Sequence, residues 1–88
     1  MEFDWDGANV THIGSHGITP AEVEQAYRNE PLVIERQDRN EIRQLCLGET
    51  DDGRLLAFVF TERGDKLRIV TAYPMHKKQR EFYLAENK

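Results

Sequence analysis

The sequence is short of the features that mark secreted and membrane-spanning chains. Its single cysteine, Cys46, excludes a disulfide within the chain, and this suits a reducing compartment. No apolar run approaches the about 20 residues that a helix needs to cross a bilayer. The opening residues, MEFDWD, are acidic and lack the basic and apolar pattern of a secretory signal. We therefore expect a cytoplasmic protein with one domain over residues 1–88.

Phosphate-binding glycine loops and nucleophile elbows are also missing from the sequence. Two histidines, His12 and His16, stand four residues apart, a spacing that can bring two imidazoles to one metal on a helix. However, there is no glutamate at the second position and no evident third ligand, so contacts with the sheet and with helix-end carbonyl groups are favoured. We expect no metal and no cofactor.

Charge is unevenly distributed along a chain whose net charge is −4. Residues 1–30 contain six acids and one base, and residues 31–62 contain seven acids and four bases. Residues 63–88 reverse the balance, with three acids and seven bases. A basic C-terminal third in an acidic chain favours either an anionic partner at that end or an acidic–basic contact within the fold.

Helix signals come first along the chain. Asp6 is suited to cap a short helix over residues 6–16. The motif TPAE, residues 19–22, has the form of a capping box with proline at the first helical position. This second helix should end near Asn29, because a proline follows two residues later.

The next part of the chain predicts four strands, over residues 32–36, 41–48, 54–60 and 66–73. The connections between them are short and contain turn residues such as Asp52-Gly53 and Gly64-Asp65. Short connections of this chemistry join neighbouring antiparallel strands. The four strands are therefore predicted to form an antiparallel meander.

The last helix is expected to begin at Pro74. On it, Met75, Gln79 and Phe82 share the face that should dock on the sheet. Two helices, four strands and a final helix then follow one another along the chain. This order predicts the α+β class, with helices packed against one sheet.

The last helix also carries side chains that suit work on a phosphodiester. His76, Arg80 and Tyr83 recur at i, i+4 and i+7, beside the face expected to dock. Arginine neutralises a phosphate and the charge of its transition state, and His, Tyr or Glu moves protons to and from hydroxyl oxygens. The alternative is a solvated basic helix with exposed ion pairs, such as Lys77–Glu81.

The order of the motifs resembles that of the BrnT-type toxins over residues 3–83. The stretch WDGANVTHIGSHGITPAEVEQAY is similar to the opening of that family, in a divergent N-x-x-H-I-x-x-H-G subgroup. The stretch LGETDDGRLLAFVFTERGDKLRIVTAYPMHKKQREFY is similar to its second half. Where many relatives continue Thr/Ser-Ala with arginine, this chain has Tyr73.

The resemblance implies a RelE/ParE-like fold, with two N-terminal helices, a four-stranded antiparallel meander and a C-terminal helix packed on it. It implies the toxin of a type II toxin–antitoxin system, a metal-independent ribonuclease that cleaves RNA and arrests translation. It also implies a cognate antitoxin, usually a ribbon-helix-helix DNA-binding protein, and hence a hetero-oligomer. A second hypothesis is a catalytically inactive interaction module that binds a small partner protein through its basic face.

The residues and the resemblance together give the expected site. The residues expected to act in catalysis are Arg68, Arg80, Tyr83, Glu81 and His76. The residues expected to bind RNA are Lys77, Lys78, Arg54 and Arg63. This hypothesis requires Arg68, Arg80 and Tyr83 to converge on one open patch of positive potential.

Overall fold

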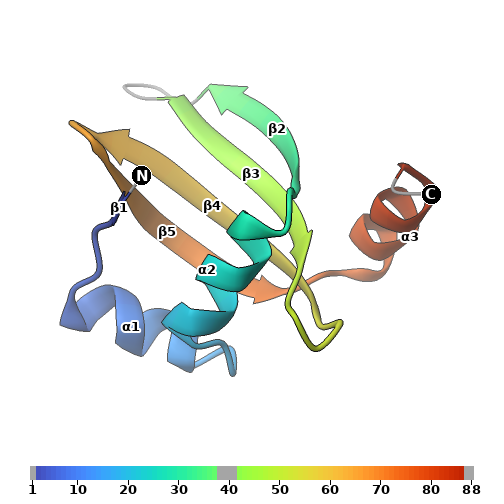
Figure 1. The fold of residues 1–88 in the computed structure, drawn as a ribbon, viewed down its shortest axis with the longest axis horizontal. Coiled ribbons are helices and arrows are strands. Elements are labelled where there is room, and N and C mark those ends of the chain that lie inside the picture. Colours follow the sequence, from blue (N-terminus) through green and yellow to red (C-terminus); the bar gives the residue numbers. More distant parts are fainter. Residues whose placement is uncertain (1, 38–41, 87–88) are drawn as a thin grey trace.

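A computed structural model describes residues 2–37 and 42–86, which form three helices and a five-stranded sheet. In chain order the elements are β1 (Glu2–Phe3), α1 (Gly7–Gly14), α2 (Pro20–Arg28), β2 (Leu32–Gln37), β3 (Ile42–Glu49), β4 (Leu55–Arg63), β5 (Lys66–Pro74) and α3 (Lys77–Glu86). The strand order across the sheet is β1-β5-β4-β3-β2 (Figure 1). The predicted α+β class is confirmed.

The strands from β2 to β5 form the antiparallel meander that the sequence predicts. The predicted sheet is wrong in one respect, because β1 adds a fifth strand that runs parallel to β5 and makes the sheet mixed. This strand forms where Phe3 pairs with Leu67 and packs against the main core. A strand of two residues is too short for alternation to reveal it. Glu41, the first residue of a predicted strand, lies outside the described residues.

Both N-terminal helices begin at the predicted capping residues. Asp6 Oδ1 accepts a hydrogen bond from the Asn9 backbone N–H at 2.8 Å. Thr19 Oγ1 accepts from the Glu22 N–H at 3.2 Å, and Glu22 Oε1 accepts from the Thr19 N–H at 3.0 Å. These reciprocal bonds close the predicted capping box and satisfy donors that a helix start leaves unpaired.

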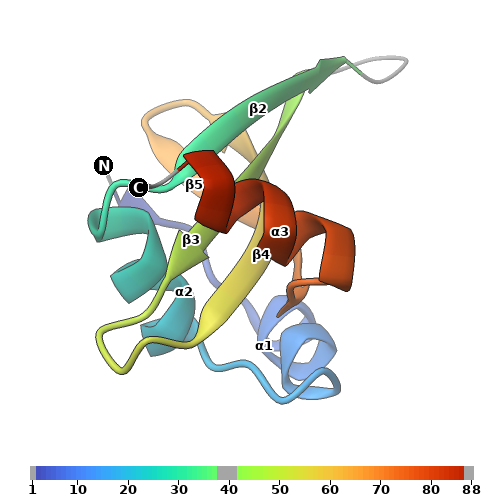
Figure 2. The ribbon, with the colours of Figure 1, turned by 90° about the vertical axis from the view of Figure 1, so that its right-hand side faces the viewer.

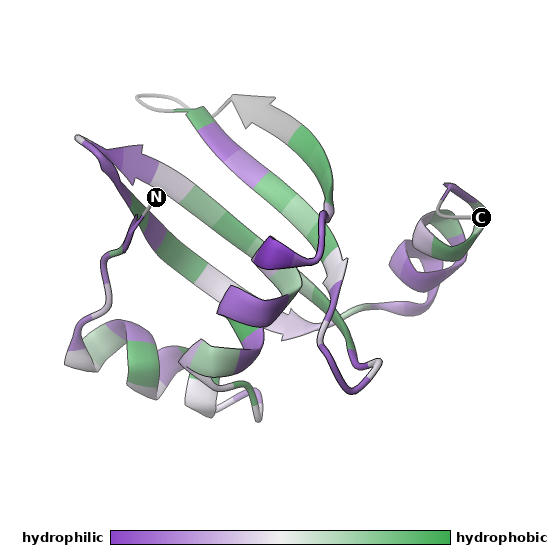
Figure 3. Ribbon diagram, viewed as in Figure 1, coloured by the Kyte–Doolittle hydropathy of each residue, from purple (hydrophilic) through white to green (hydrophobic). Residues whose placement is uncertain are grey.

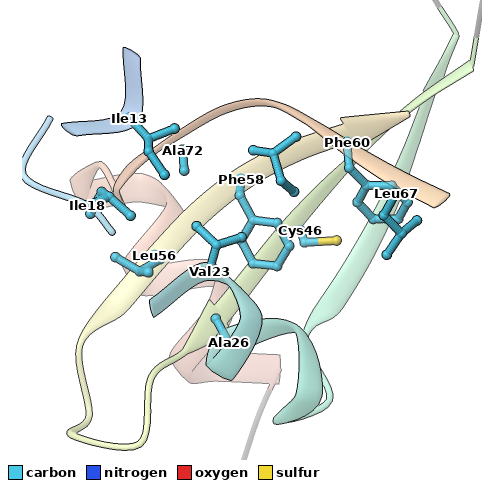
Figure 4. Close-up of a cluster of buried hydrophobic side chains, with 11 residues drawn as sticks. Ile13, Ile18, Val23, Ala26, Cys46, Leu56, Phe58, Phe60, Leu67 and Ala72 are labelled. Carbon is cyan, nitrogen blue, oxygen red and sulfur yellow. The ribbon is translucent and has the colours of Figure 1, made fainter. Parts of the chain in front are cut away.

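The main core lies between the sheet and the two N-terminal helices. Alternate residues of the central strand β4, Leu56, Phe58 and Phe60, point into it, and Val23 of α2 meets them (Figure 4). None of these four side chains is more than 4% exposed, and burying each contributes about 1.5–3 kcal/mol. Cys46 is buried in the same cluster, and burial raises the pKa of its thiol to about 12.

A second, smaller cluster lies on the other face of the sheet, beneath α3. Leu47 of β3 and Ala57 of β4 form its floor, and Met75 and Tyr83 cover them. Figures 1 and 2 show that α3 lies apart from α1 and α2, on the opposite side of the strands. The sheet therefore has one face covered by the N-terminal helices and another that α3 covers only near one end.

The last helix begins later than the sequence predicts. Its first residue is Lys77, because Pro74 is still paired with Leu56 as the last residue of β5. The predicted docking face is wrong for Phe82, which is 48% exposed, while its neighbour Tyr83 is 2% exposed. Successive helical residues are about 100° apart around the axis, so docking through the next residue turns Phe82 toward solvent.

Gly48 of β3 lets α2 approach the sheet closely. A Cβ atom at this position would lie 3.0 Å from the Ala26 carbonyl oxygen and 3.1 Å from Pro31 Cβ. We predict that Gly48→Ala lowers the free energy of unfolding by about 1–3 kcal/mol, because backbone must move to admit the methyl group. Urea unfolding followed by circular dichroism measures this change.

Gly14→Ala is the matched control for the close approach at Gly48. Apart from its chain neighbours and the backbone of its own helix, no atom lies within 4 Å of a Cβ placed at Gly14. Alanine is favoured over glycine in a helix by about 0.5–1 kcal/mol, so this variant should be as stable as the parent or more stable. Equal destabilisation by the two substitutions would contradict the steric explanation.

Candidate functional site

The candidate site is built on the face of the meander opposite the main core. Side chains alternate between faces along a strand, so Ala57, Val59 and Thr61 of β4 lie on the face of the second cluster. Their partners on β5 are Tyr73, Thr71 and Arg68. Because α3 covers the Ala57 end, we call the remainder of this face, around Val59, Thr61, Thr71 and Arg68, the open face.

A register shift in β5 makes Arg68 and Thr71 neighbours on the open face. Thr61 pairs with Arg68 and Val59 pairs with Thr71, so a step of two residues on β4 matches a step of three on β5. Val70 has no partner in this register and is the extra residue of a bulge. Without the bulge, Arg68 and Thr71 would lie on opposite faces of the sheet.

Arg68 is held by acidic residues of the N-terminal segment. Its Nη2 donates to Asp6 Oδ2 at 2.8 Å, and its Nη1 lies 3.7 Å from Asp4 Oδ2. The hydrogen bond from the Asn9 backbone N–H and the pairing with Arg68 lower the pKa of Asp6. An acidic–basic contact within the fold, one of the two alternatives that the charge distribution favours, is therefore present at this pair.

Arg43 of β3 adds a second arginine to the end of the open face that carries Arg68. Gln44 pairs with Phe60, so the next residues on the two antiparallel strands, Arg43 and Thr61, are neighbours. Thr61 is 5% exposed and pairs on its other side with Arg68. The sheet ends there at the β4–β5 hairpin, which is hydrophilic (Figure 3). Arginines on both sides of Thr61 suit the binding of a phosphate.

The helix α1 covers the outer edge of β5 with polar side chains. Asn9 Nδ2 donates to the Ile69 carbonyl oxygen at 2.8 Å. His16 Nδ1 lies 2.9 Å from the Ala72 carbonyl oxygen, to which it donates. The carbonyl partner expected for His16 is thus found on β5 rather than on its own helix. These bonds occupy backbone carbonyl groups at the outer edge of β5 that β1 is too short to reach.

His12 lies where α1 meets the open face. Its Nε2 is 3.0 Å from Thr71 Oγ1, which confirms the predicted contact with the sheet. The ring centroids of His12 and His16 are 5.2 Å apart, edge to face. The His12 side chain is exposed. Within residues 2–37 and 42–86, no group of three or more potential metal ligands occurs.

His76, the residue just before α3, adds another imidazole near the same strand. The rings of His76 and Tyr73 are stacked, with centroids 4.9 Å apart and planes at 27°. Gln79 Oε1 accepts from the His76 backbone N–H at 2.9 Å, and Gln79 Nε2 donates to the Tyr73 hydroxyl at 3.1 Å. Because Thr71 and Tyr73 are alternate residues of one strand, His12 and His76 contact neighbouring side chains on one face.

The structure does not bring Arg68, Arg80 and Tyr83 to one open patch. Arg68 lies toward the hairpin end of β5, whereas Arg80 donates from Nη1 to the Met75 carbonyl oxygen at 2.7 Å, beyond the other end. Tyr83 is buried beneath α3, where burial and the Glu49 carboxylate raise its pKa. The predicted convergence is wrong, because Tyr83 is the residue through which α3 docks.

The other predicted residues lie in two regions. Exposed on α3 are Lys77, Lys78 and Glu81. Arg54 donates to Glu22 Oε2 and to the Gly17 carbonyl oxygen, both at 2.9 Å, and so belongs to the side of α2. Arg63 is exposed at the β4–β5 hairpin. The structure gives these residues positions, and their roles in catalysis or RNA binding stay predictions.

The predicted site leaves out His12, Arg43 and Tyr73. His12 and Thr71 are 59 residues apart in the sequence, so no local pattern links them. Alternation along the strands could place Arg43 and Tyr73 on one face, but only once the pairing register and the bulge at Val70 are known. Sequence reasoning therefore missed these residues because it lacked the long-range strand register, and not because their residue types are unsuited to the site.

These residues define a small α+β protein whose half-open sheet face has arginines at one end and imidazoles toward the other. A family described as "Ribonuclease toxin, BrnT, of type II toxin-antitoxin system" matches residues 5–79. The chain therefore belongs to this family of ribonuclease toxins, as its motifs indicate. No curated protein matches the chain. Among the described residues, no helix has the length and apolar character to cross a membrane.

The Asp6–Arg68 pair predicts a loss of stability in acid. The pKa of Asp6 is lowered from its usual 3.8 in the folded protein. Such a group stabilises the fold above its unfolded pKa, and this contribution is lost as the pH falls through the folded pKa. We expect the melting temperature to fall below about pH 4, and to fall less steeply in Asp6→Asn, which keeps a capping side chain.

Asp52→Asn is the matched control for this pH dependence. Asp52 is exposed in the turn between β3 and β4, so its substitution should leave the parent's melting curve unchanged. Differential scanning fluorimetry from about pH 7 down to about pH 3 compares the three proteins. If Asp6→Asn followed the parent at every pH, the Asp6–Arg68 pair would not contribute to acid sensitivity.

Proposed function

We propose that this toxin cleaves RNA on the open face of its sheet, through protein side chains alone. The main support is that Arg43 and Arg68 share this face with the stacked pair Tyr73–His76. Guanidinium groups bind a phosphate and the extra charge of its transition state. An imidazole moves a proton to or from a hydroxyl oxygen. The strands β3 and β5 hold Arg43, Arg68 and Tyr73 in fixed relative positions, and His76 is stacked on Tyr73.

The reaction that such groups suit is transfer of the phosphate to the neighbouring 2′-hydroxyl. The 2′-oxygen loses its proton and attacks phosphorus, and the 5′-oxygen leaves and gains a proton. Arg68 is suited to hold the phosphate because Asp6 fixes its guanidinium by a hydrogen bond of 2.8 Å. A guanidinium has five N–H donors, so the same residue can serve both the carboxylate and a phosphate.

The family implies an antitoxin, and we infer that it is a ribbon-helix-helix DNA-binding protein that meets the toxin in the cytoplasm. The exposed residues Lys77 and Lys78, at the start of α3, are suited to receive an acidic segment of such a partner. Co-expression with the product of the neighbouring reading frame tests the pairing. Recovery of a stable complex supports it, and separate elution of the two proteins contradicts it.

Arg68→Ala tests the phosphate-binding role. We expect induced expression of this variant to relieve growth arrest, and RNA cleavage by the purified protein to fall about 100-fold. Arg28→Ala is the matched control, because the Arg28 side chain is 64% exposed on α2, away from the open face. Melting temperatures of both variants show whether the fold is kept. A folded Arg68→Ala protein that stays fully toxic would overturn the assignment.

Tyr83→Phe tests the role that the family resemblance gives to Tyr83. Tyr83 is 2% exposed, so it presents almost no surface to RNA. We expect cleavage within about threefold of the parent's and a lower melting temperature, because a buried hydroxyl loses its contacts. A large loss of cleavage at unchanged stability would instead favour a direct role.

A parent that neither cleaves RNA nor arrests growth would favour the interaction module.

A further inference from the structure

We infer that His12 and His76 form the acid–base pair of this ribonuclease site, with one imidazole supplied by α1 and the other by the residue just before α3. The inference rests on the proposed function and adds a residue from the N-terminal helix to a site otherwise built from the sheet and α3. His12 Nε2 lies 3.0 Å from Thr71 Oγ1, and the His76 ring lies 4.9 Å from that of Tyr73. Both imidazoles belong to exposed residues.

Thr71 and Tyr73, which His12 and His76 contact, are spaced along β5 in a way that suits imidazoles on opposite sides of one reacting phosphate. Thr71 and Tyr73 are alternate residues of β5, so their Cα atoms are about 7 Å apart along the strand. An in-line displacement needs a proton acceptor beside the attacking oxygen and a proton donor beside the leaving oxygen. Arg68, the neighbour of Thr71 across the bulge, can neutralise a phosphate bound near His12.

The proposed step is balanced without a further reactant. The unprotonated imidazole takes the proton of the 2′-hydroxyl while the 2′-oxygen forms its bond to phosphorus. The bond between phosphorus and the 5′-oxygen breaks, and the protonated imidazole gives its proton to that oxygen. The products are a 2′,3′-cyclic phosphate and a free 5′-hydroxyl. The two imidazoles exchange protonation states, and solvent restores them.

Several charged or titratable groups surround the pair on the elements that pack against it. They are His16 just after α1, Arg68 with Asp4 and Asp6, Tyr73 on β5, and Lys77, Lys78 and Arg80 on α3. The cations among them attract a phosphate toward the space beside the two imidazoles. His16 is engaged with the Ala72 carbonyl oxygen, but the other groups can affect the pH dependence of cleavage, so the test relies on removing one imidazole at a time.

His16 offers a matched control for His12. Both lie near the end of α1, four residues apart, and their rings are in contact. His16 donates to a backbone carbonyl of β5, at Ala72, and so completes the cover of the strand edge. His12 instead meets the side-chain hydroxyl of Thr71 on the open face. Replacing His16 should therefore affect the fold, and replacing His12 should affect the reaction.

The experiment compares the parent with His12→Gln, His76→Gln and His16→Gln in cleavage of a short RNA from about pH 5 to about pH 9. We expect a bell-shaped profile for the parent and a 2′,3′-cyclic phosphate among its products. His12→Gln and His76→Gln should each lower kcat about 100-fold or more, remove one limb of the profile, and leave KM and the melting temperature unchanged. His16→Gln should keep the parent's kcat and profile and lower the melting temperature.

The outcomes separate this inference from the proposed function. A His12→Gln protein with the parent's kcat and pH profile overturns the inference while the ribonuclease function stands. If the parent does not cleave RNA, the proposed function fails. Titration with a nucleoside 3′-monophosphate, followed by NMR of the histidine rings, then decides whether His12 and His76 share a phosphate site. Shifts of the His12 and His76 resonances without a shift of His16 support a shared phosphate site. An unchanged His12 resonance overturns it.

Discussion

The carboxylate of Asp6 joins the start of a helix to the arginine of the open face. One oxygen accepts the Asn9 N–H and so caps α1, and the other binds the Arg68 guanidinium. Because α1 has only eight residues, its direction depends on this start and on the bond from Asn9 to the Ile69 carbonyl oxygen of β5. The position of His12 beside Thr71 follows from that direction. A single side chain therefore positions groups at both ends of the open face.

Local sequence signals were sufficient for the starts of the two N-terminal helices and for the meander, because caps and turns act over a few residues. The capping box at Thr19 and the antiparallel pairing of four strands are examples. The docking face of α3 was not predictable in this way. Phe82 and Tyr83 are adjacent aromatic residues, and the fit against Leu47 and Ala57 decides which one is buried. The assembly of the site likewise depends on strand register, which no short stretch contains.

The acidic composition and the basic C-terminal third are reconciled at the Arg68 site. Asp4 and Asp6 partly neutralise Arg68, so a polyanion must compete with carboxylates that the fold already supplies. Non-specific affinity for nucleic acid comes mainly from phosphate contacts and falls with salt. A toxin of this design would bind RNA weakly wherever only the backbone is offered. Selection of a target would then depend on contacts beyond the phosphate.

The covered edge of β5 also determines where the sheet can grow. Exposed strand edges are templates onto which a strand from another molecule can add. Here β1 pairs with Lys66 and Leu67, and Asn9 and His16 bind carbonyl groups further along. An incoming strand would have to lift α1 away and break its link to Arg68. Extension of the sheet, whether in an assembly or in an aggregate, is therefore directed to the β2 end of the strand order.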